Sequence, residues 1–112
     1  MNRGDVVRVH WPYTDQTGGK TRPAVVVQAD YLTGIVDDTI LVQITSKIHG
    51  ITGTEVILDP AAEPVSGLNK RCVASCSNIL TYDENLILGR IGVLSDSAMQ
   101  LIDECLKSAL GL

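Results

Sequence analysis

The chain has 112 residues, of which 45% are hydrophobic and 20% are charged. This length predicts a single domain over residues 1–112, because too little chain remains for a second core. No apolar run reaches the ~20 residues that cross a bilayer, and the first residues do not resemble a secretory signal. We therefore expect a cytoplasmic protein that makes no contact with a membrane. The net charge of −4 argues against a nucleic-acid partner, although clustered cations could still form a local basic groove.

The first half of the chain predicts three strands. Apolar and polar side chains alternate over residues 7–11, which is typical of a strand with one buried face. The polar residues 13–21 predict a mobile loop or hairpin tip. Pro23 then opens the run Ala-Val-Val-Val at 24–27, which predicts a central strand covered on both faces. Residues 39–45 predict the third strand.

The second half predicts three further, shorter strands. Residues 46–53 contain two glycines and predict a loop, which leads to a short strand over 54–58. The segment 59–67 carries two prolines and a glycine, and we interpret it as a surface excursion. Strand patterns resume at 71–76 and again within 88–94.

The end of the chain changes to a helical period. Ser95 is a suitable N-cap, and Gly111 can adopt the left-handed C-terminal cap. One face of this amphipathic helix carries the apolar residues Met99, Ile102, Leu106 and Ala109. Several short strands followed by one helix predict a mainly antiparallel β fold, a small curved sheet or SH3-like barrel with a C-terminal helix.

The three cysteines predict neither a disulfide nor a metal site. Cys72 and Cys76 lie four residues apart in a strand pattern, so their Cα atoms are ~13 Å apart, which is beyond disulfide reach. The spacing lacks a CxxC motif and a nearby pair of histidines, which argues against structural zinc. We expect reduced and mostly buried thiols, and no cofactor.

An ordered set of motifs resembles the MazF/PemK family of toxins from type II toxin-antitoxin systems. The motifs are Arg3-Gly4-Asp5-Val6-Val7, Lys20-Thr21-Arg22-Pro23-Ala24-Val25-Val26-Val27, Thr45-Ser46, Gly89-Arg90-Ile91-Gly92 and Leu94-Ser95-Asp96, followed by the helix. The resemblance implies a CcdB/MazF/PemK-like fold, a homodimer and sequence-selective, metal-independent cleavage of single-stranded RNA. It also implies a cognate antitoxin that inhibits the enzyme by laying an acidic, extended tail across the RNA groove.

The resemblance and the chemistry of RNA cleavage together make Arg22 and Thr45 the candidate catalytic residues. RNA can be cut when its own 2′-hydroxyl attacks phosphorus, leaving a 2′,3′-cyclic phosphate and a 5′-hydroxyl. The enzyme must then stabilise charge on the phosphorane and assist two proton transfers. The planar guanidinium of Arg22 suits the first task. The hydroxyl of Thr45 could bind a phosphate oxygen or orient the 2′-hydroxyl, and Ser46 could take its place.

Further cations could hold the RNA without reading its bases. The candidate RNA-binding residues are Lys20, Ser46, Lys47, Lys70 and Arg71, with solvated surface charge as the alternative for each cation. Trp11 and Tyr13 could stack an unpaired base, but Trp11 shares the apolar face of its strand and is expected in the core. His10 and His49 are interpreted as exposed side chains rather than proton carriers.

The chain departs from the family pattern in one strand, and an alternative function is weighed against RNA cleavage. A branch of the family uses an arginine and a carboxylate in the strand that corresponds to residues 74–78, where this chain has Ser75 and Ser77. That version of the mechanism is therefore not expected. A CcdB-like poison of DNA gyrase or a non-catalytic SH3-like binding module is the alternative function, but a gyrase poison of this kind depends on a C-terminal tryptophan-containing tail. This chain ends Ala-Leu-Gly-Leu.

Overall fold

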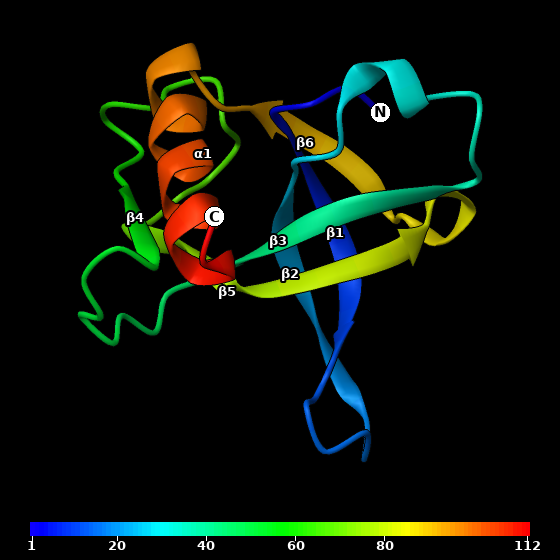
Figure 1. Ribbon diagram of the computed structural model, residues 1–112, viewed down its shortest axis with the longest axis horizontal. Coiled ribbons are helices and arrows are strands. Elements are labelled where there is room, and N and C mark those ends of the chain that lie inside the picture. Colours follow the sequence, from blue (N-terminus) through cyan, green and yellow to red (C-terminus); the bar gives the residue numbers. More distant parts are fainter.

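The computed structural model describes residues 1–112, in which one six-stranded antiparallel sheet is followed by one α-helix (Figure 1). Two one-turn 3₁₀ helices, η1 and η2, interrupt the strands. The elements in chain order are β1 (Asp5–Pro12), β2 (Gly19–Val26), η1 (Asp30–Leu32), β3 (Asp38–Thr45), β4 (Glu55–Leu58), β5 (Cys72–Asp83), η2 (Glu84–Leu86), β6 (Gly89–Val93) and α1 (Asp96–Leu110). None of the helices is long and apolar enough to cross a membrane.

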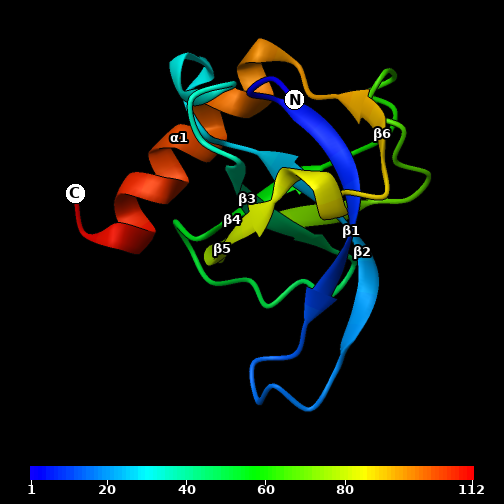
Figure 2. The same cartoon turned by 90° about the vertical axis from the view of Figure 1, so that its right-hand side faces the viewer.

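The sheet curls into a half-barrel with the strand order β4-β5-β3-β2-β1-β6. Its two outer strands, β4 and β6, do not pair with each other, so the barrel stays open. Helix α1 packs at one side of the sheet, and the β1–β2 hairpin projects from the body in both ribbon views (Figures 1 and 2). The predicted class, a curved antiparallel sheet with a C-terminal amphipathic helix, is confirmed.

Strand β2 is covered on both faces because side chains of successive residues alternate between them. Val25 belongs to the larger core cluster, which includes Met99 and Ile102 of the helix. Ala24 and Val26 belong to a smaller cluster on the opposite face, together with Trp11. This arrangement confirms the predicted central strand and places Trp11 in the core.

Helix α1 begins and ends at the predicted caps. The Ser95 hydroxyl accepts a hydrogen bond from the Ala98 backbone N–H, and Gly111 adopts a left-handed φ of 73°. A left-handed backbone is easily adopted only by glycine, so the helix stops there. Its buried residues are Ala98, Met99 and Ile102, which face the larger core cluster.

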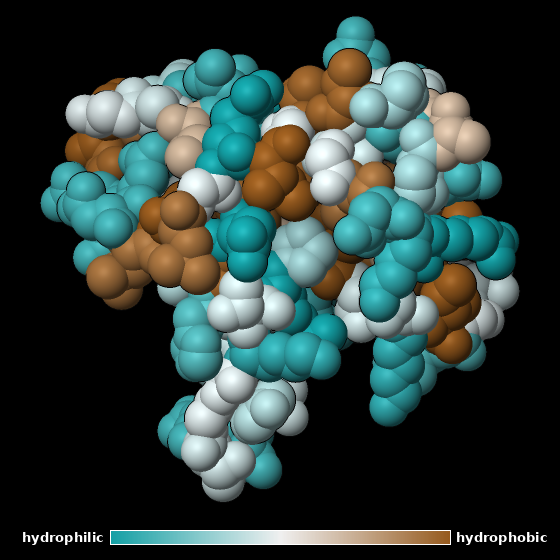
Figure 3. Space-filling view, turned by 180° about the vertical axis from the view of Figure 1, so that it is seen from behind, coloured by the Kyte–Doolittle hydropathy of each residue, from teal (hydrophilic) through white to brown (hydrophobic).

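The β1–β2 hairpin is longer than the sequence predicts. Strand β2 begins at Gly19 rather than near Pro23, because Gly19 and Lys20 pair with Pro12 and Trp11. The turn is therefore confined to residues 13–18. Polar composition suggested a loop, but backbone pairing across the twisted ribbon does not depend on apolar side chains. The projecting hairpin shows no strongly hydrophobic surface in the space-filling view (Figure 3).

Strand β5 is also longer than predicted, because it continues beyond a bulge. Its pairing with β3 shifts register between Val42, which faces Ile79, and Gln43, which faces Ser75. Residues 76–78 are the extra residues on the β5 side. Their polar members interrupt the apolar pattern that marked residues 71–76, so the sequence suggested an end where the strand only bends.

The excursion 59–67 is anchored to the sheet and helix rather than held in solvent. The buried carboxylate of Glu63 accepts hydrogen bonds from the N–H and the hydroxyl of Ser95, both at 2.7 Å. A Cβ atom at Gly92 would overlap the backbone of Val65 and Ser66, so only glycine permits this approach. The excursion thereby fixes the start of the 67–70 loop, which forms one wall of the site described next.

Candidate functional site

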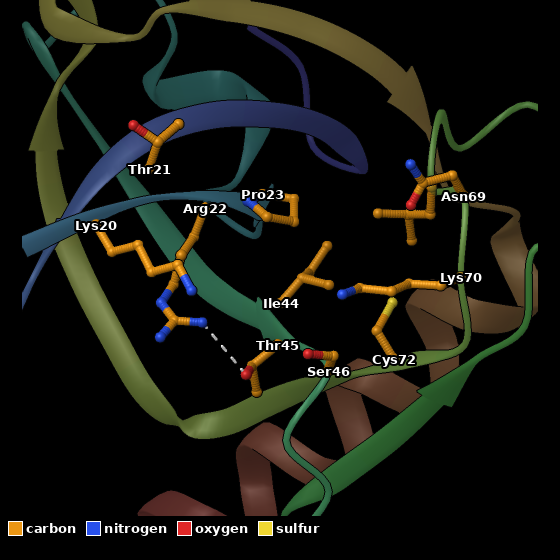
Figure 4. A pocket seen from close by; sticks show the side chains of 11 residues that line it. Lys20, Thr21, Arg22, Pro23, Ile44, Thr45, Ser46, Asn69, Lys70 and Cys72 are labelled. Carbon is orange, nitrogen blue, oxygen red and sulfur yellow. Dashed lines mark hydrogen bonds between the residues drawn. The ribbon is translucent and has the colours of Figure 1, made fainter.

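The candidate site opens where β2 and β3 separate. The two strands pair only between Ala24–Val26 and Leu41–Gln43. Beyond that point the first half of β2 stays with β1, while the end of β3 stays with β5. The gap holds a cavity of about 200 Å³ (Figure 4). Its lining residues are Lys20, Thr21, Arg22, Pro23, Ile44, Thr45, Ser46, Leu68, Asn69, Lys70 and Cys72.

The structure brings Arg22 and Thr45 together across this gap. Nη1 of Arg22 donates a hydrogen bond of 3.4 Å to Oγ1 of Thr45, as Figure 4 shows. This distance is at the long end for an N–H···O bond. The guanidinium can therefore turn to a stronger acceptor, such as an anion in the cavity, at little cost.

The Thr45 hydroxyl accepts a second hydrogen bond, from the backbone N–H of Lys47 at 3.2 Å. A hydroxyl has two lone pairs and one proton to donate. With Arg22 and Lys47 as donors, both lone pairs of Thr45 are engaged. The hydroxyl proton then remains available for an acceptor in the cavity.

The cavity gathers cations that no carboxylate neutralises. Arg22 and Lys70 point into it from opposite sides, and Lys20 also lines it (Figure 4). Ion pairs involve only three of the nine Lys and Arg side chains, namely Arg3, Arg90 and Lys107. No Asp or Glu lines the cavity. The chain is acidic overall, yet its local charge here is positive.

A second hollow of about 380 Å³ adjoins the first. It shares Thr21, Arg22, Pro23, Leu68 and Asn69 with the cavity and is completed by Arg8, Gly67 and Ile91. The two hollows form one groove across β2. Arg8 is not among the predicted binding residues, because the alternation in β1 indicates an exposed side chain without showing what lies beside it.

The predicted RNA-binding residues do not all lie in the cavity. Lys20, Ser46 and Lys70 line it. Lys47 is exposed and lines neither hollow, so its contribution to the cavity is the backbone N–H that holds Thr45. Arg71 is exposed and also lines neither hollow.

The candidate stacking residue Tyr13 and the two histidines interpreted as exposed side chains lie outside the cavity. Tyr13 is exposed on the projecting hairpin, and His10 is exposed beside Gly19. His49 forms an ion pair with Glu55, with 3.6 Å between Nδ1 and Oε2. None of the three lines either hollow.

The loop after Thr45 is held by one carboxylate. Glu55 accepts hydrogen bonds from the backbone N–H groups of His49, Gly50 and Ile51 at 3.0, 2.7 and 3.1 Å. These donors, the His49 N–H first among them, lower the pKa of Glu55 from its ordinary value. The carboxylate therefore fixes the loop that carries Ser46 and Lys47 while it is ionised.

The cysteines are free thiols, as expected. Cys72 lines the cavity, but burial raises the pKa of its thiol. Burial also raises the pKa of Cys76 to about 12. Both thiols stay protonated at neutral pH, which makes them poor nucleophiles. No group of three or more His, Cys, Asp or Glu side chains comes together in a way that could hold a metal ion.

Ser75 and Ser77 lie at the β5 bulge without charged neighbours in the strand. Ser75 is buried and accepts a hydrogen bond of 2.8 Å from Nδ2 of Asn78, while Ser77 is exposed. The cations of the site therefore come from β2 and the 67–70 loop rather than from β5.

The half-barrel and its cation-lined cavity define a small β protein with a positively charged site. The sequence profile of the family described as "PemK-like, MazF-like toxin of type II toxin-antitoxin system" matches residues 2–110. The chain belongs to this family.

Solved structures with the same architecture come from two groups of bacteria. An endoribonuclease in complex with its cognate antitoxin, from Mycobacterial species, superposes with a TM-score of 0.81 at 23% identity, covering 100% of this chain and 96% of that one. The Mycobacterium tuberculosis toxin MazF-mt6 gives 0.73 at 27% identity, over 94% and 97%. The MazE-MazF structure (Form-III) from Deinococcus radiodurans gives 0.76 at 21% identity, over 100% and 97%.

Proposed function

We propose that this protein is a toxin that cleaves single-stranded RNA, without a metal ion, at the cavity between β2 and β3. The proposal rests on the contact between the Arg22 guanidinium and the Thr45 hydroxyl, which are 3.4 Å apart. This contact lies in a cavity that is lined by further cations and by no carboxylate. Membership of the toxin family supports it, as does similarity to a structure named an endoribonuclease.

The proposed reaction begins when the RNA 2′-oxygen attacks the adjacent phosphorus. The bond from phosphorus to the 5′-oxygen then breaks, which leaves a 2′,3′-cyclic phosphate and a 5′-hydroxyl. Arg22 binds the non-bridging phosphate oxygens with its planar fork and stabilises their growing charge in the transition state. Lys20 and Lys70 add to this positive field from the same cavity.

Thr45 acts in this scheme as a hydrogen-bond donor to the phosphate. Its lone pairs are engaged by Arg22 and by the Lys47 N–H, so its proton is the group it can offer. The lining residues include no His, Asp or Glu. The 2′-hydroxyl proton is therefore passed to water or to a phosphate oxygen, and the leaving 5′-oxygen takes its proton from water. The cavity contributes charge stabilisation and positioning. Ser46 is the alternative hydroxyl in the same lining.

The proposed partners follow from charge and exposed apolar surface. The unpaired cations of the groove suit the acidic C-terminal tail of a cognate antitoxin. Ile48, Ile51 and Ile57 are exposed and line a hollow of about 190 Å³ beside the edge strand β4. Such surface favours burial in a two-fold homodimer. We propose that residues 1–112 act as one domain in the cytoplasm.

The test of the proposed function is cleavage of a long unstructured RNA by the purified protein in excess EDTA. We expect fragments that end in 2′,3′-cyclic phosphate and begin with 5′-hydroxyl. Intact RNA across varied sequences would contradict the proposal. RNA that is bound but not cut would indicate a non-catalytic binding module instead. Light scattering at micromolar concentration tests the homodimer, for which a monomer is the contradicting result.

A further inference from the structure

The second hollow extends the cleavage cavity around the free edge of β2. In the β1–β2 register Arg8 faces Pro23 and Val9 faces Arg22, so the two arginines are diagonal neighbours on opposite faces of the ribbon. Strand β3 no longer covers β2 at this point, because its pairing begins only at Ala24. A chain lying at Arg22 can therefore pass over the edge of β2 and reach Arg8.

Apart from Arg22, which contacts Thr45, the polar side chains of the second hollow have no partners within the protein. Arg8 is exposed and forms neither an ion pair nor a side-chain hydrogen bond, in contrast to Arg3 and Arg90. The side chains of Thr21 and Asn69, which line the same hollow, form no hydrogen bonds either. No carboxylate lines it. Together they offer hydrogen-bond donors and one full positive charge to an anion with several oxygen acceptors.

We propose that the second hollow, which Arg8 lines, is a phosphate subsite. It binds the phosphodiester next to the one cleaved at Arg22. This inference rests on the proposed function for the identity of the bound strand. Continuity with the cavity favours a nucleic-acid strand, because five residues line both hollows. Leu68, Pro23 and Ile91 give the hollow an apolar wall, against which the sugar or base between the two phosphates can lie. Arg8 then contributes to RNA binding without contacting the reacting atoms.

The first experiment measures the salt dependence of binding to a 2′-O-methyl RNA pool of random sequence, which lacks the attacking hydroxyl and so cannot be cleaved. Neutralising one phosphate of a single strand contributes about 0.7 to the slope of log K against log salt. We expect Arg8→Gln to lower this slope by about 0.7 and Arg8→Lys to preserve it. The matched control is Lys107→Gln on the exposed side of α1, which removes the same charge outside the groove and should leave the slope unchanged.

The second experiment measures the affinity for 2′-O-methyl RNAs of two to six nucleotides. The wild type should gain affinity at the length where a second phosphate reaches Arg8, and Arg8→Gln should lack that one step. Equal slopes and equal steps in wild type and Arg8→Gln would overturn the subsite. If Arg8→Gln weakens only binding of an acidic peptide, such as oligoglutamate, the hollow serves a protein tail and the inference is also wrong.

The outcomes separate this inference from the proposed function. If RNA is cut in EDTA but Arg8 has no effect on slope or length dependence, the subsite fails and the cleavage site stands. If no RNA is cut but binding still depends on Arg8, the cleavage mechanism fails and the phosphate subsite stands. Absence of any binding by the wild type would contradict both.

Discussion

Polar side chains are largely unpaired in the β2–β3 cavity, whereas those at the interface between α1 and the sheet have partners within the protein. At the helix, Ser95 caps the first turn and donates hydrogen bonds to the Glu63 carboxylate. Arg3 forms an ion pair with Asp103. In the cavity, Lys20 and Lys70 have no carboxylate partner, and the Arg22 side chain has only its long contact with Thr45. Satisfied groups hold the fold together, whereas unpaired groups keep their binding capacity for a ligand.

This difference predicts that stability and activity can be changed separately. Substitutions at the helix interface should shift unfolding and leave the cavity chemistry intact in the folded fraction. Substitutions in the cavity should change activity with little effect on unfolding, because exposed cations contribute little to stability.

The largest effect is expected from Ile102→Ala in α1. Ile102 is fully buried in the larger core cluster, and truncation of a buried isoleucine costs roughly 2–5 kcal/mol. Urea unfolding measures the loss. The matched control is Leu101→Ala, the preceding residue, which is 57% exposed and should change stability by less than about 0.5 kcal/mol. Equal losses at the two positions would contradict the packing of the helix.

Thr45→Val tests the hydroxyl of the cavity with little change of shape. A hydrogen bond to a charged group is worth about 1.5–3 kcal/mol, so we expect kcat to fall about 10- to 100-fold. Thr45→Ser restores the hydroxyl and should recover most of the rate. If Thr45→Val is as active as the wild type, the assisting hydroxyl is not Thr45, and Ser46→Ala becomes the decisive variant.

Gly92→Ala tests the close approach that anchors the 59–67 excursion. The new methyl group would overlap the backbone of Val65 and Ser66, and overpacking typically costs about 1–3 kcal/mol. Gly89→Ala is the control in the same strand, because no atom lies within 4 Å of a Cβ built there. Urea unfolding should show a lower midpoint for Gly92→Ala only. Comparable midpoints would mean that the excursion is not seated on β6.

The smallest effect is expected from protonation of Glu55. Its pKa is lowered in the folded state, so its contribution is fully present above the ordinary glutamate pKa and is lost as pH falls through the lowered value. The amide signals of His49, Gly50 and Ile51 should shift together in an NMR titration over that acidic range. Glu55→Gln should abolish the shared titration, and its persistence in that variant would contradict the anchoring role.

The sequence predicted the parts of the fold that depend on side-chain alternation. Buried and exposed residues alternate in β1 as expected, and the helix caps at Ser95 and Gly111 lie where predicted. The first half of β2 and the second half of β5 were missed, because polar side chains there obscure a backbone ladder that continues regardless. The burial of Glu63 was missed because its donors belong to Ser95, 32 residues away.

The site was predicted only in part, because it also depends on contacts between residues that are far apart in the sequence. Arg22 and Thr45 were selected from motifs and phosphate chemistry, but their contact spans 23 residues and depends on where β3 leaves β2. No local pattern encodes that separation. The alternation over residues 7–11 agrees with the exposure of Arg8, but the hollow beside this side chain is formed by the distant residues Gly67, Leu68 and Asn69.

The most direct test of the β2–β3 cavity as the cleavage site is the cleavage rate of Arg22→Ala in excess EDTA, measured together with its unfolding midpoint. Loss of one preorganised group that stabilises transition-state charge should lower kcat about 10²- to 10³-fold. The unfolding midpoint should match that of the wild type, because the Arg22 side chain forms no ion pair and only one long hydrogen bond. Cleavage at the wild-type rate, or a loss of rate that only follows a loss of folded protein, would contradict the assignment of this cavity as the cleavage site.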